Sequence, residues 1–249
     1  MTSIVIVTPT HTDSISNLEE QRLKLSLSLN EGVSHKFVVP DSLNITGLSK
    51  KFPNSTFQKF SDDYFKSKYT YNSLLLNSNF YENFLDFDYV LLCQFDSIII
   101  KNVKTLLEFN FIYLGASWNP SFYIREFLGR IYTNRTYLPF GRLHELQSGN
   151  GGLSLRNPNQ INQILKLAHK SLFFQKIIGE TRNINEDILT VFILKKFGIP
   201  PVEKNVANKY FIETASRSEY KLNEVYGFHQ LYRYDRELES TLLDSFKFD

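Results

Sequence analysis

One carboxylate stands between two apolar runs in the segment YVLLCQFDSIII, residues 89–100. Both runs are rich in Val, Leu and Ile, which is typical of a strand that is buried on both faces. We expect Asp96 to lie where the first run ends, and ligands of open α/β sheets collect at the carboxyl ends of strands. Gln94 alternates with Asp96 on the same side. The pair therefore indicates a binding site, although Asp and Ser are also common turn residues.

Three other polar positions could do chemistry. Glu186 and Asp187 open an apolar segment, where the helix dipole favours acidic residues. A carboxylate at such a helix start could also be a general base. His229 in Gly227-Phe228-His229 is either a structural histidine or a metal ligand. Together with Asp96 and a diphosphate, His229 would complete a hard site for Mn²⁺ or Mg²⁺.

The first half of the chain predicts the elements that would position these residues. Strands are expected over residues 4–7, 35–39 and 56–60, and a helix over 17–29 with Asn17 as its N-cap. Strand, loop and helix in this order open a doubly wound fold, so we predict a single α/β domain, Rossmann-like, with a mostly parallel central sheet flanked by helices. Neither the glycine-rich dinucleotide pattern nor a P-loop follows the first strand.

The second half continues the alternation of elements. Helices are predicted over residues 71–85, 101–109, 158–170 and 185–197, and strands over 113–118 and 153–156. The 185–197 helix is apolar nearly all round, which indicates that it is buried. Residues 119–147 show little periodicity, so we expect an irregular lid or insertion near an acceptor site. Gly149-Asn150-Gly151-Gly152 reads as a glycine turn, or as backbone that approaches a ligand closely.

Composition narrows the function classes. The chain has 249 residues, of which 42% are hydrophobic, and a formal charge of +2. The charges are scattered, so no dedicated nucleic-acid surface is expected. The single Cys93 favours a reducing compartment, and no signal peptide or apolar run of about 20 residues occurs. We predict a cytoplasmic protein, with at most peripheral association with the inner face of the membrane.

Seven motifs occur in an order that carries a resemblance. They are YNSLLL (71–76), FYENF (80–84), YVLLCQFD (89–96), LGASW (114–118), GNGGLSLR (149–156), NED (185–187) and GFH (227–229). Between about residues 3 and 233, the chain resembles a little-characterised family of GT-A fold glycosyltransferases found in bacterial polysaccharide gene clusters. The resemblance implies transfer of a sugar from a nucleotide diphosphate donor, with a UDP-sugar the first choice, to a hydroxyl of a glycan or lipid-linked acceptor.

The resemblance also implies roles for individual residues. Asp96 matches the last position of the Asp-x-Asp motif, which binds Mn²⁺ or Mg²⁺ and, through it, the donor diphosphate, and His229 matches the C-terminal metal ligand. Asp187 matches the base of inverting members, with Glu186 beside it. The remaining matches are donor-side residues Thr8, Thr10, His11, Gln94, Gly151 and Gly152, and acceptor-side residues Trp118 and Asn150.

The chain departs from this pattern at Gln94, which stands where the motif has its first Asp. Glutamine can bond a ribose or sugar hydroxyl, but it removes a negative charge from the metal site. Two alternatives stay open. A sugar nucleotidyltransferase would need a glycine-rich, basic loop after the first strand, which Thr8-Pro9-Thr10-His11 does not supply. A noncatalytic module would bind a nucleotide sugar or a glycan without turnover.

Overall fold

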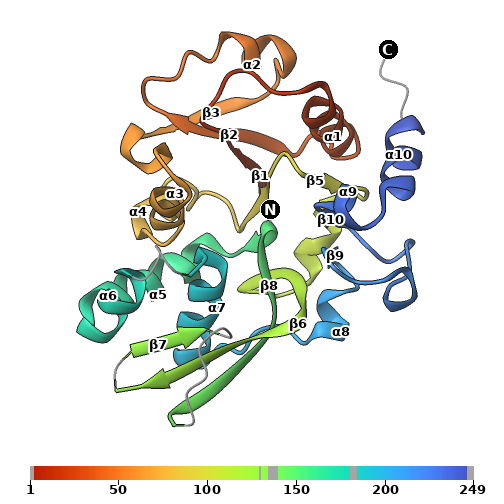
Figure 1. Cartoon of the computed structure of the whole chain (residues 1–249). Coiled ribbons are helices and arrows are strands. Elements are labelled where there is room, and N and C mark those ends of the chain that lie inside the picture. The colour runs from red at the N-terminus through yellow and green to blue at the C-terminus, as the bar shows by residue number, and fades with distance from the viewer. Residues whose placement is uncertain (1–2, 129, 134–139, 180–183, 246–249) are drawn as a thin grey trace.

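A seven-stranded sheet forms the centre of the protein, and the computed structural model describes residues 3–128, 130–133, 140–179 and 184–245 (Figure 1). The spatial order is β3-β2-β1-β4-β8-β6-β7. The strands are β1 (Ile4–Pro9), β2 (Ser34–Pro40), β3 (Thr56–Phe60), β4 (Tyr89–Cys93), β6 (Tyr113–Phe127), β7 (Arg130–Thr133) and β8 (Arg142–Arg156). The predicted α/β class is confirmed.

The sheet is parallel on one side and antiparallel on the other. The strands β3, β2, β1 and β4 run parallel, whereas β8 is antiparallel to both β4 and β6, and β7 is antiparallel to β6. Val7 of β1 pairs with Leu92 of β4, so both strands end at the same edge. Within this sheet the parallel pairing is restricted to the N-terminal half, which contains the strands that precede the expected site, so the sheet is mixed rather than mostly parallel.

A second, three-stranded sheet lies beside this edge. It has the order β5-β10-β9, from β5 (Ser97–Ile99), β10 (Gly227–His229) and β9 (Phe211–Ile212). The apolar run 89–100 thus divides as expected at its polar residues: β4 belongs to the large sheet and β5 to the small one. The amide of Ser97 donates to the carbonyl of Gln94 at 2.9 Å, which closes the turn that contains Asp96.

Helices cover the sheet and form the rim of the site. They are α1 (Asn17–Ser28), α2 (Thr46–Lys51), α3 (Lys68–Leu75), α4 (Ser78–Glu82), α5 (Pro158–Lys170), α6 (Leu172–Gly179), α7 (Glu186–Lys196), α8 (Lys204–Ala207), α9 (Leu231–Tyr234) and α10 (Arg236–Asp244). Short 3₁₀ helices are η1 (Asp62–Phe65), η2 (Val103–Glu108) and η4 (Arg217–Glu219). None of the helices in the described ranges is long and apolar enough to cross a membrane.

Two helix predictions need correction. The N-cap of α1 is Ser16, because its hydroxyl accepts from the Glu19 amide while the Glu19 carboxylate accepts from the Ser16 amide, a capping box. The predicted helix 71–85 is two helices, since α3 ends at Leu75 and α4 begins after Asn77. The Asn77 side chain accepts from the Asn79 amide and so caps a new helix.

Residues 119–147 are not irregular where the structure describes them. They continue β6, add β7 and begin β8, and these strands form an arm that extends away from the rest of the fold (Figure 1). We call described residues 122–128, 130–133 and 140–146 the β arm. Only Ile124, Ile131, His144 and Leu146 of the β arm are buried. The apolar signal is therefore too sparse to predict these strands.

The glycine run is also part of a strand rather than a turn. Residues 149–152 lie within β8, and the pairing of β6 with β8 shifts register here. Gly149 has a φ of +128°, and a side chain at Gly115 would meet the Asn150 carbonyl at 2.2 Å. The glycines thus permit a bulge and a close approach of backbones, a role that a turn pattern does not distinguish.

The buried helix α7 packs against one face of the sheet, as predicted. All of its residues from Glu186 to Leu194 are buried, and Leu189, Phe192 and Ile193 join the largest hydrophobic cluster with Val5, Val7 and Leu92. Ile4, Ile6 and Leu91 alternate with these and pack in a second cluster on the opposite face. The strands that end at the site are consequently fixed from both sides.

Candidate active site

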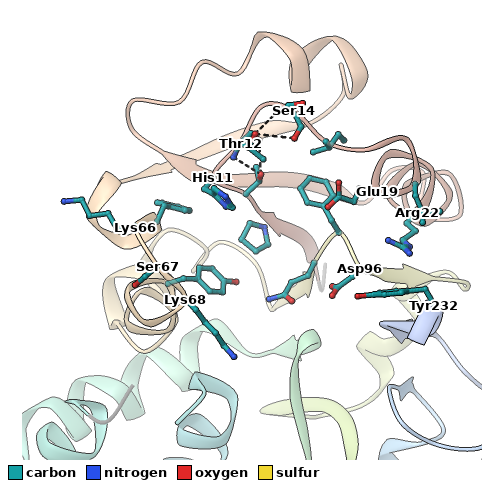
Figure 2. A pocket seen from close by; sticks show the side chains of 18 residues that line it. His11, Thr12, Ser14, Glu19, Arg22, Lys66, Ser67, Lys68, Asp96 and Tyr232 are labelled. Carbon is teal, nitrogen blue, oxygen red and sulfur yellow. Dashed lines mark hydrogen bonds between the residues drawn. The ribbon is translucent and has the colours of Figure 1, made fainter. Parts of the chain in front are cut away.

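A cavity of about 760 Å³ opens at the carboxyl ends of β1 and β4. This volume is within the range of about 300–1,000 Å³ that small-molecule sites occupy. It is lined from the β1 end by Pro9, Thr10, His11 and Thr12, from the β4–β5 turn by Gln94, Phe95 and Asp96, and from the rim by Lys66, Ser67, Lys68 and Tyr71, with further residues of α1 and α9. Figure 2 shows Arg22, Asp96 and Tyr232 gathered on one side, and Lys66, Ser67 and Lys68 on the other.

Asp96 and His229 meet beside this cavity. Asp96 Oδ1 lies 3.3 Å from His229 Nε2, and both atoms are buried without a hydrogen-bond partner among the described residues. The other ends of both groups are fixed: Asp96 Oδ2 accepts from Gln230 Nε2 at 2.9 Å, and His229 Nδ1 lies 3.1 Å from Glu213 Oε1. Asp96 Oδ1 and His229 Nε2 are therefore held facing the same small space between the two side chains.

The electrostatics of this pair favour a positive charge between the two atoms. Burial opposes ionisation of Asp96, but the neighbouring His229 and the hydrogen bond from Gln230 hold its pKa below the usual range. Burial would likewise lower the pKa of His229, but the two carboxylates Asp96 and Glu213 raise it to about 9. A proton or a metal cation at Nε2 satisfies both groups.

Asp96 and His229 could hold a divalent cation between them. Carboxylate oxygen and imidazole nitrogen are common ligands of Mn²⁺, and such ions often complete their shell with substrate phosphates and water. Within the described ranges, no group of three or more His, Cys, Asp or Glu side chains could hold a metal ion. Asp96 and His229 would thus supply two ligands, and a bound diphosphate would supply others.

Gly151 and Gly152 bring two further elements against β8. A Cβ on Gly152 would lie 2.1 Å from His229 Nε2, and a Cβ on Gly151 would lie 3.0 Å from the Asp187 Cβ. Neither position could carry a side chain without displacing its neighbour. The glycine pair therefore lies between the His229 side of the site and the start of α7.

Asp187 is held by backbone amides at the start of α7. Its Oδ2 accepts from the Gly151 amide at 3.0 Å and its Oδ1 from the Ile188 amide at 2.8 Å. Burial, together with the negative charge of Glu186, raises the pKa of Asp187 to about 6, although the two amide bonds act in the opposite direction. Its carboxylate is thus a stronger base than an exposed aspartate and is ionised at neutral pH.

Glu186 has a different environment from its neighbour. Its Oε1 accepts from Arg156 Nη1 at 2.7 Å, and Arg156 also donates to Ser154, Tyr81 and Tyr113. The Arg156 side chain is fully buried. The charge of Glu186 is therefore compensated inside the protein.

Sequence similarity places the chain in a family. A family model described as "Protein of unknown function (DUF5672)" matches residues 54–229. The chain belongs to this family. The matched region of this DUF5672 member contains Asp96, both glycines, Asp187 and His229. Among curated proteins, none matches the chain in sequence.

Solved structures resemble this DUF5672 member in fold. The galactosyltransferase LgtC, in complex with donor and acceptor sugar analogs, aligns with a TM-score of 0.59 at 12% identity over 98% of this chain and 97% of that chain. An active-site mutant of LgtC aligns with a TM-score of 0.59 at 13% identity, with the same coverage. The bifunctional glycosyltransferase WbbM, in its apo form, aligns with a TM-score of 0.51 at 9% identity. The alignment covers 92% of this chain and 45% of that chain. These likenesses establish a GT-A type fold.

The structure divides the predicted site residues into two groups. Thr10, His11, Gln94 and Asp96 line the cavity, and His229 contacts Asp96. The predicted residues that do not line it are Asp187, Glu186, Gly151, Gly152, Trp118 and Asn150. Asn150 Oδ1 accepts from the Gly152 amide at 3.0 Å, and Trp118 packs 6.1 Å from Phe122, ring centre to ring centre. The second group gathers around β8 and the start of α7.

Thr8 is the predicted donor residue that the structure places apart from both groups. It is fully buried, and its hydroxyl bonds to His35 Nε2 at 3.0 Å inside the domain. It does not line the cavity. The position of Thr8 therefore does not support the predicted contact with the nucleotide.

Sequence reasoning missed Glu213. This residue follows β9, a two-residue strand that local periodicity does not reveal. Its contact with His229 depends on the pairing of β9 with β10, since β10 carries the histidine. Only the acidic residue at the end of a short apolar run, YFIE, could have indicated a second carboxylate near a strand end.

Proposed function

We propose that this protein is a glycosyltransferase that moves a sugar from a nucleotide diphosphate donor to a hydroxyl of an acceptor. One observation carries the proposal: Asp96 Oδ1 and His229 Nε2 are both buried, make no hydrogen bond to a described residue and lie 3.3 Å apart beside the cavity. The fold supports it, because the LgtC structure of the same fold holds donor and acceptor sugar analogs.

The donor would lie in the cavity with its nucleotide against the β1 end. Thr10 and His11 line that side, and Gln94 and Asp96 line the side toward His229. Gln94 can donate to and accept from a sugar or ribose hydroxyl. Asp96 and His229 would hold Mn²⁺ or Mg²⁺, which when bound neutralises charge on the leaving diphosphate. A UDP-sugar is the first donor to test.

The transfer step would form one bond and break one. The acceptor hydroxyl oxygen attacks the anomeric carbon, the bond from that carbon to the diphosphate oxygen breaks, and the nucleoside diphosphate leaves. Asp187 would take the hydroxyl proton, and a single displacement on the face opposite the diphosphate would invert the anomeric carbon. The raised pKa of this carboxylate, about 6, supports the role, because a base works best when its pKa is near the working pH. We assign Glu186 to positioning, since Arg156 compensates its charge.

The test begins with donor binding. UDP-, GDP-, CMP- and dTDP-sugars are screened with Mn²⁺ for an increase in melting temperature, because a ligand that binds only the native state stabilises it. Transfer and donor hydrolysis are then measured for the wild type, Asp96→Ala and Asp187→Ala. Loss of transfer in both variants supports the proposal, and unchanged transfer in both overturns the site.

The same experiment separates the alternatives. A wild type that binds a donor but neither transfers nor hydrolyses the sugar is a noncatalytic binding module. Release of pyrophosphate from a nucleoside triphosphate and a sugar phosphate would instead identify a nucleotidyltransferase. The anomeric configuration of a transferred sugar, read by NMR, decides between inversion and retention.

For the acceptor we propose a glycan or lipid-linked oligosaccharide of bacterial surface polysaccharide synthesis, reached by peripheral contact with the inner face of the membrane. The β arm supports this setting. At its tip Leu128 is 85% exposed, Phe140 68% and Leu143 52%, and the neighbouring Arg130 and Arg142 are exposed as well. Apolar side chains flanked by arginines suit an anionic membrane surface.

A further inference from the structure

We propose that Glu213 is a positioning residue of the metal site: its carboxylate fixes His229 so that Nε2 faces the cation, and it supplies a negative charge that Gln94 lacks. This inference rests on the proposed metal-assisted function. Glu213 Oε1 lies 3.1 Å from His229 Nδ1, and its side chain is 12% exposed. The role requires no contact between Glu213 and the cation.

Strand pairing brings the two residues together. Gly227 and Phe228 of β10 pair with Phe211 and Ile212 of β9 in parallel. One step further along this register, His229 lies next to Glu213, and neighbouring residues of paired strands point to the same side. The contact is thus a consequence of the small sheet.

The carboxylate determines which nitrogen of His229 can bind a metal. An ionised carboxylate only accepts hydrogen bonds, so Nδ1 must carry the hydrogen in its contact with Glu213. In the neutral ring, Nε2 then has a free lone pair. Nε2, the nitrogen left for a metal, lies 3.3 Å from Asp96 Oδ1 and makes no hydrogen bond to a described residue. A second hydrogen-bonded carboxylate is a common way to orient a metal-binding histidine.

Packing holds the ring in this orientation. A Cβ on Gly152 would lie within 2.1 to 2.5 Å of three ring atoms of His229, so the strand backbone closes against the ring. Gly152 is itself fixed, because its carbonyl accepts from the Gln94 amide at 3.0 Å and from the Ser97 hydroxyl at 3.1 Å. The imidazole is therefore confined between β8 and Glu213.

Glu213 also changes the charge of the site. Asp96 is the acidic ligand among the residues assigned to the cation, because Gln94 is neutral and a metal-binding histidine is neutral too. The Glu213 carboxylate lies on the far side of the same imidazole and makes its Nε2 a more basic ligand. Glu213 thus replaces the negative charge that Gln94 lacks, although it contacts the ligand His229 and not the cation.

The first experiment measures Mn²⁺ binding to the full chain by electron paramagnetic resonance, with no donor present. Glu213→Gln keeps an acceptor for Nδ1–H but removes the charge, and Glu213→Ala removes both. Loss of such a partner typically costs about 10- to 100-fold in metal affinity. We expect Glu213→Ala to weaken Mn²⁺ binding by about that factor and Glu213→Gln by less. The control Glu224→Gln, whose residue pairs with Lys221 on the surface at 3.0 Å, should bind as the wild type does.

The second experiment reads the histidine directly. In the Zn²⁺-loaded protein, ¹⁵N NMR should show metal-bound Nε2 and protonated Nδ1 for His229 in the wild type and Glu213→Gln. Glu213→Ala should lose this pattern. A purely structural Glu213 would change stability without changing either readout, and if the alanine variant does not fold, the glutamine variant carries the affinity test.

Unchanged Mn²⁺ affinity in both Glu213 variants, or no Mn²⁺ binding by the wild type, overturns the positioning role. If no donor is turned over while Mn²⁺ affinity still depends on Glu213, the proposed transfer fails and the positioning role stands. Failure of the proposed sugar transfer and failure of the positioning role of Glu213 therefore give different results.

Discussion

Arg156 Nη1 donates to Glu186 Oε1 at 2.7 Å, and this ion pair lies inside the domain with the arginine fully buried. The pair joins the end of β8 to the first turn of α7. It therefore fixes the helix start that also carries Asp187. In the proposed site Glu186 would act through this connection, and its negative charge helps to raise the pKa of Asp187.

We predict that Glu186→Gln is strongly destabilising. The substitution leaves the Arg156 guanidinium without its counter-charge, and removing one partner of a buried pair costs about 3–5 kcal/mol. Urea unfolding measures the change. The matched control is Glu82→Gln, because Glu82 pairs with Lys166 at 2.7 Å with both side chains at least 40% exposed. That surface pair should contribute no more than about 1 kcal/mol. Equal losses in the two variants would contradict the prediction.

We predict that Asp187→Asn lowers the transfer rate by about 10²- to 10⁴-fold, the usual contribution of a general base. In the wild type, kcat should fall as the pH decreases below about 6, because protonated Asp187 cannot take the acceptor proton. A pH–rate profile with the donor and acceptor identified in the screen measures both effects. A wild-type rate that is constant from pH 7 to pH 5 would exclude Asp187 as the base.

The same carboxyl should give stability a pH dependence of known sign. The pKa of Asp187 is about 6 in the folded chain, against about 3.9 for an aspartate in an unfolded chain. Between these values the folded state holds a proton that the unfolded chain has released, so this contribution to the unfolding free energy decreases as the pH rises through that window. The total is about 3 kcal/mol at most. Urea unfolding at pH 5 and pH 7 should show the decrease in the wild type and not in Asp187→Asn.

We predict that Gly152→Ala weakens Mn²⁺ binding at least about tenfold, because the new methyl group would displace the His229 ring that it meets at 2.1 Å. The control is Gly179→Ala in α6, where no described atom lies within 4 Å of the new Cβ. Alanine favours a helix, so this control should keep its metal affinity and its stability. Titration with Mn²⁺ measures the affinity of both variants. If Gly152→Ala binds Mn²⁺ as tightly as the wild type, the metal does not bind at His229.

We predict that the β arm contacts anionic membranes. Vesicles that contain phosphatidylglycerol should sediment with the wild type, and less so at high salt, because arginine contacts are screened. Replacing Leu128 and Phe140 with Ser removes two exposed apolar side chains. Full burial of each such side chain in the membrane would contribute about 1.5–3 kcal/mol to the binding free energy. Binding should fall at least about tenfold. Leu222→Ser, at a residue 44% exposed outside the β arm, should bind normally. Equal binding of all three proteins would exclude this surface.

Local patterns predicted the parts of the fold that depend on burial. The run from Tyr89 to Ile100 and the apolar helix after Asn185 are recognisable because buried elements carry continuous apolar signals. The β arm was predicted as irregular, since its strands face solvent over most of their length. The glycine run is compatible with a turn or with backbone that approaches a ligand, and its pattern does not indicate the close approach of β6 and β8 that the structure shows.

The candidate site was predictable only as separate residues. Asp96 and His229 each lie at a strand end, but their contact depends on the antiparallel pairing of β5 with β10, in which His229 pairs with Ser97. No local periodicity encodes that register. The resemblance supplied the role that we propose for both residues, whereas Glu213 belongs to no motif and its contact with His229 follows from the pairing of β9 with β10.

The division of residues 89–100 between two sheets has a consequence for the order of folding. β4 pairs with β1, whereas β5 pairs with β10, and Asp96 bonds to Gln230, 134 positions later in the chain. Contacts between such distant segments have a large entropy of loop closure, so they form late. During synthesis the parallel half can assemble around β1 while β5 still waits for its partner strand. Until β10 has been synthesised, β5 lacks its partner strand, and an unpaired strand edge of this kind favours aggregation.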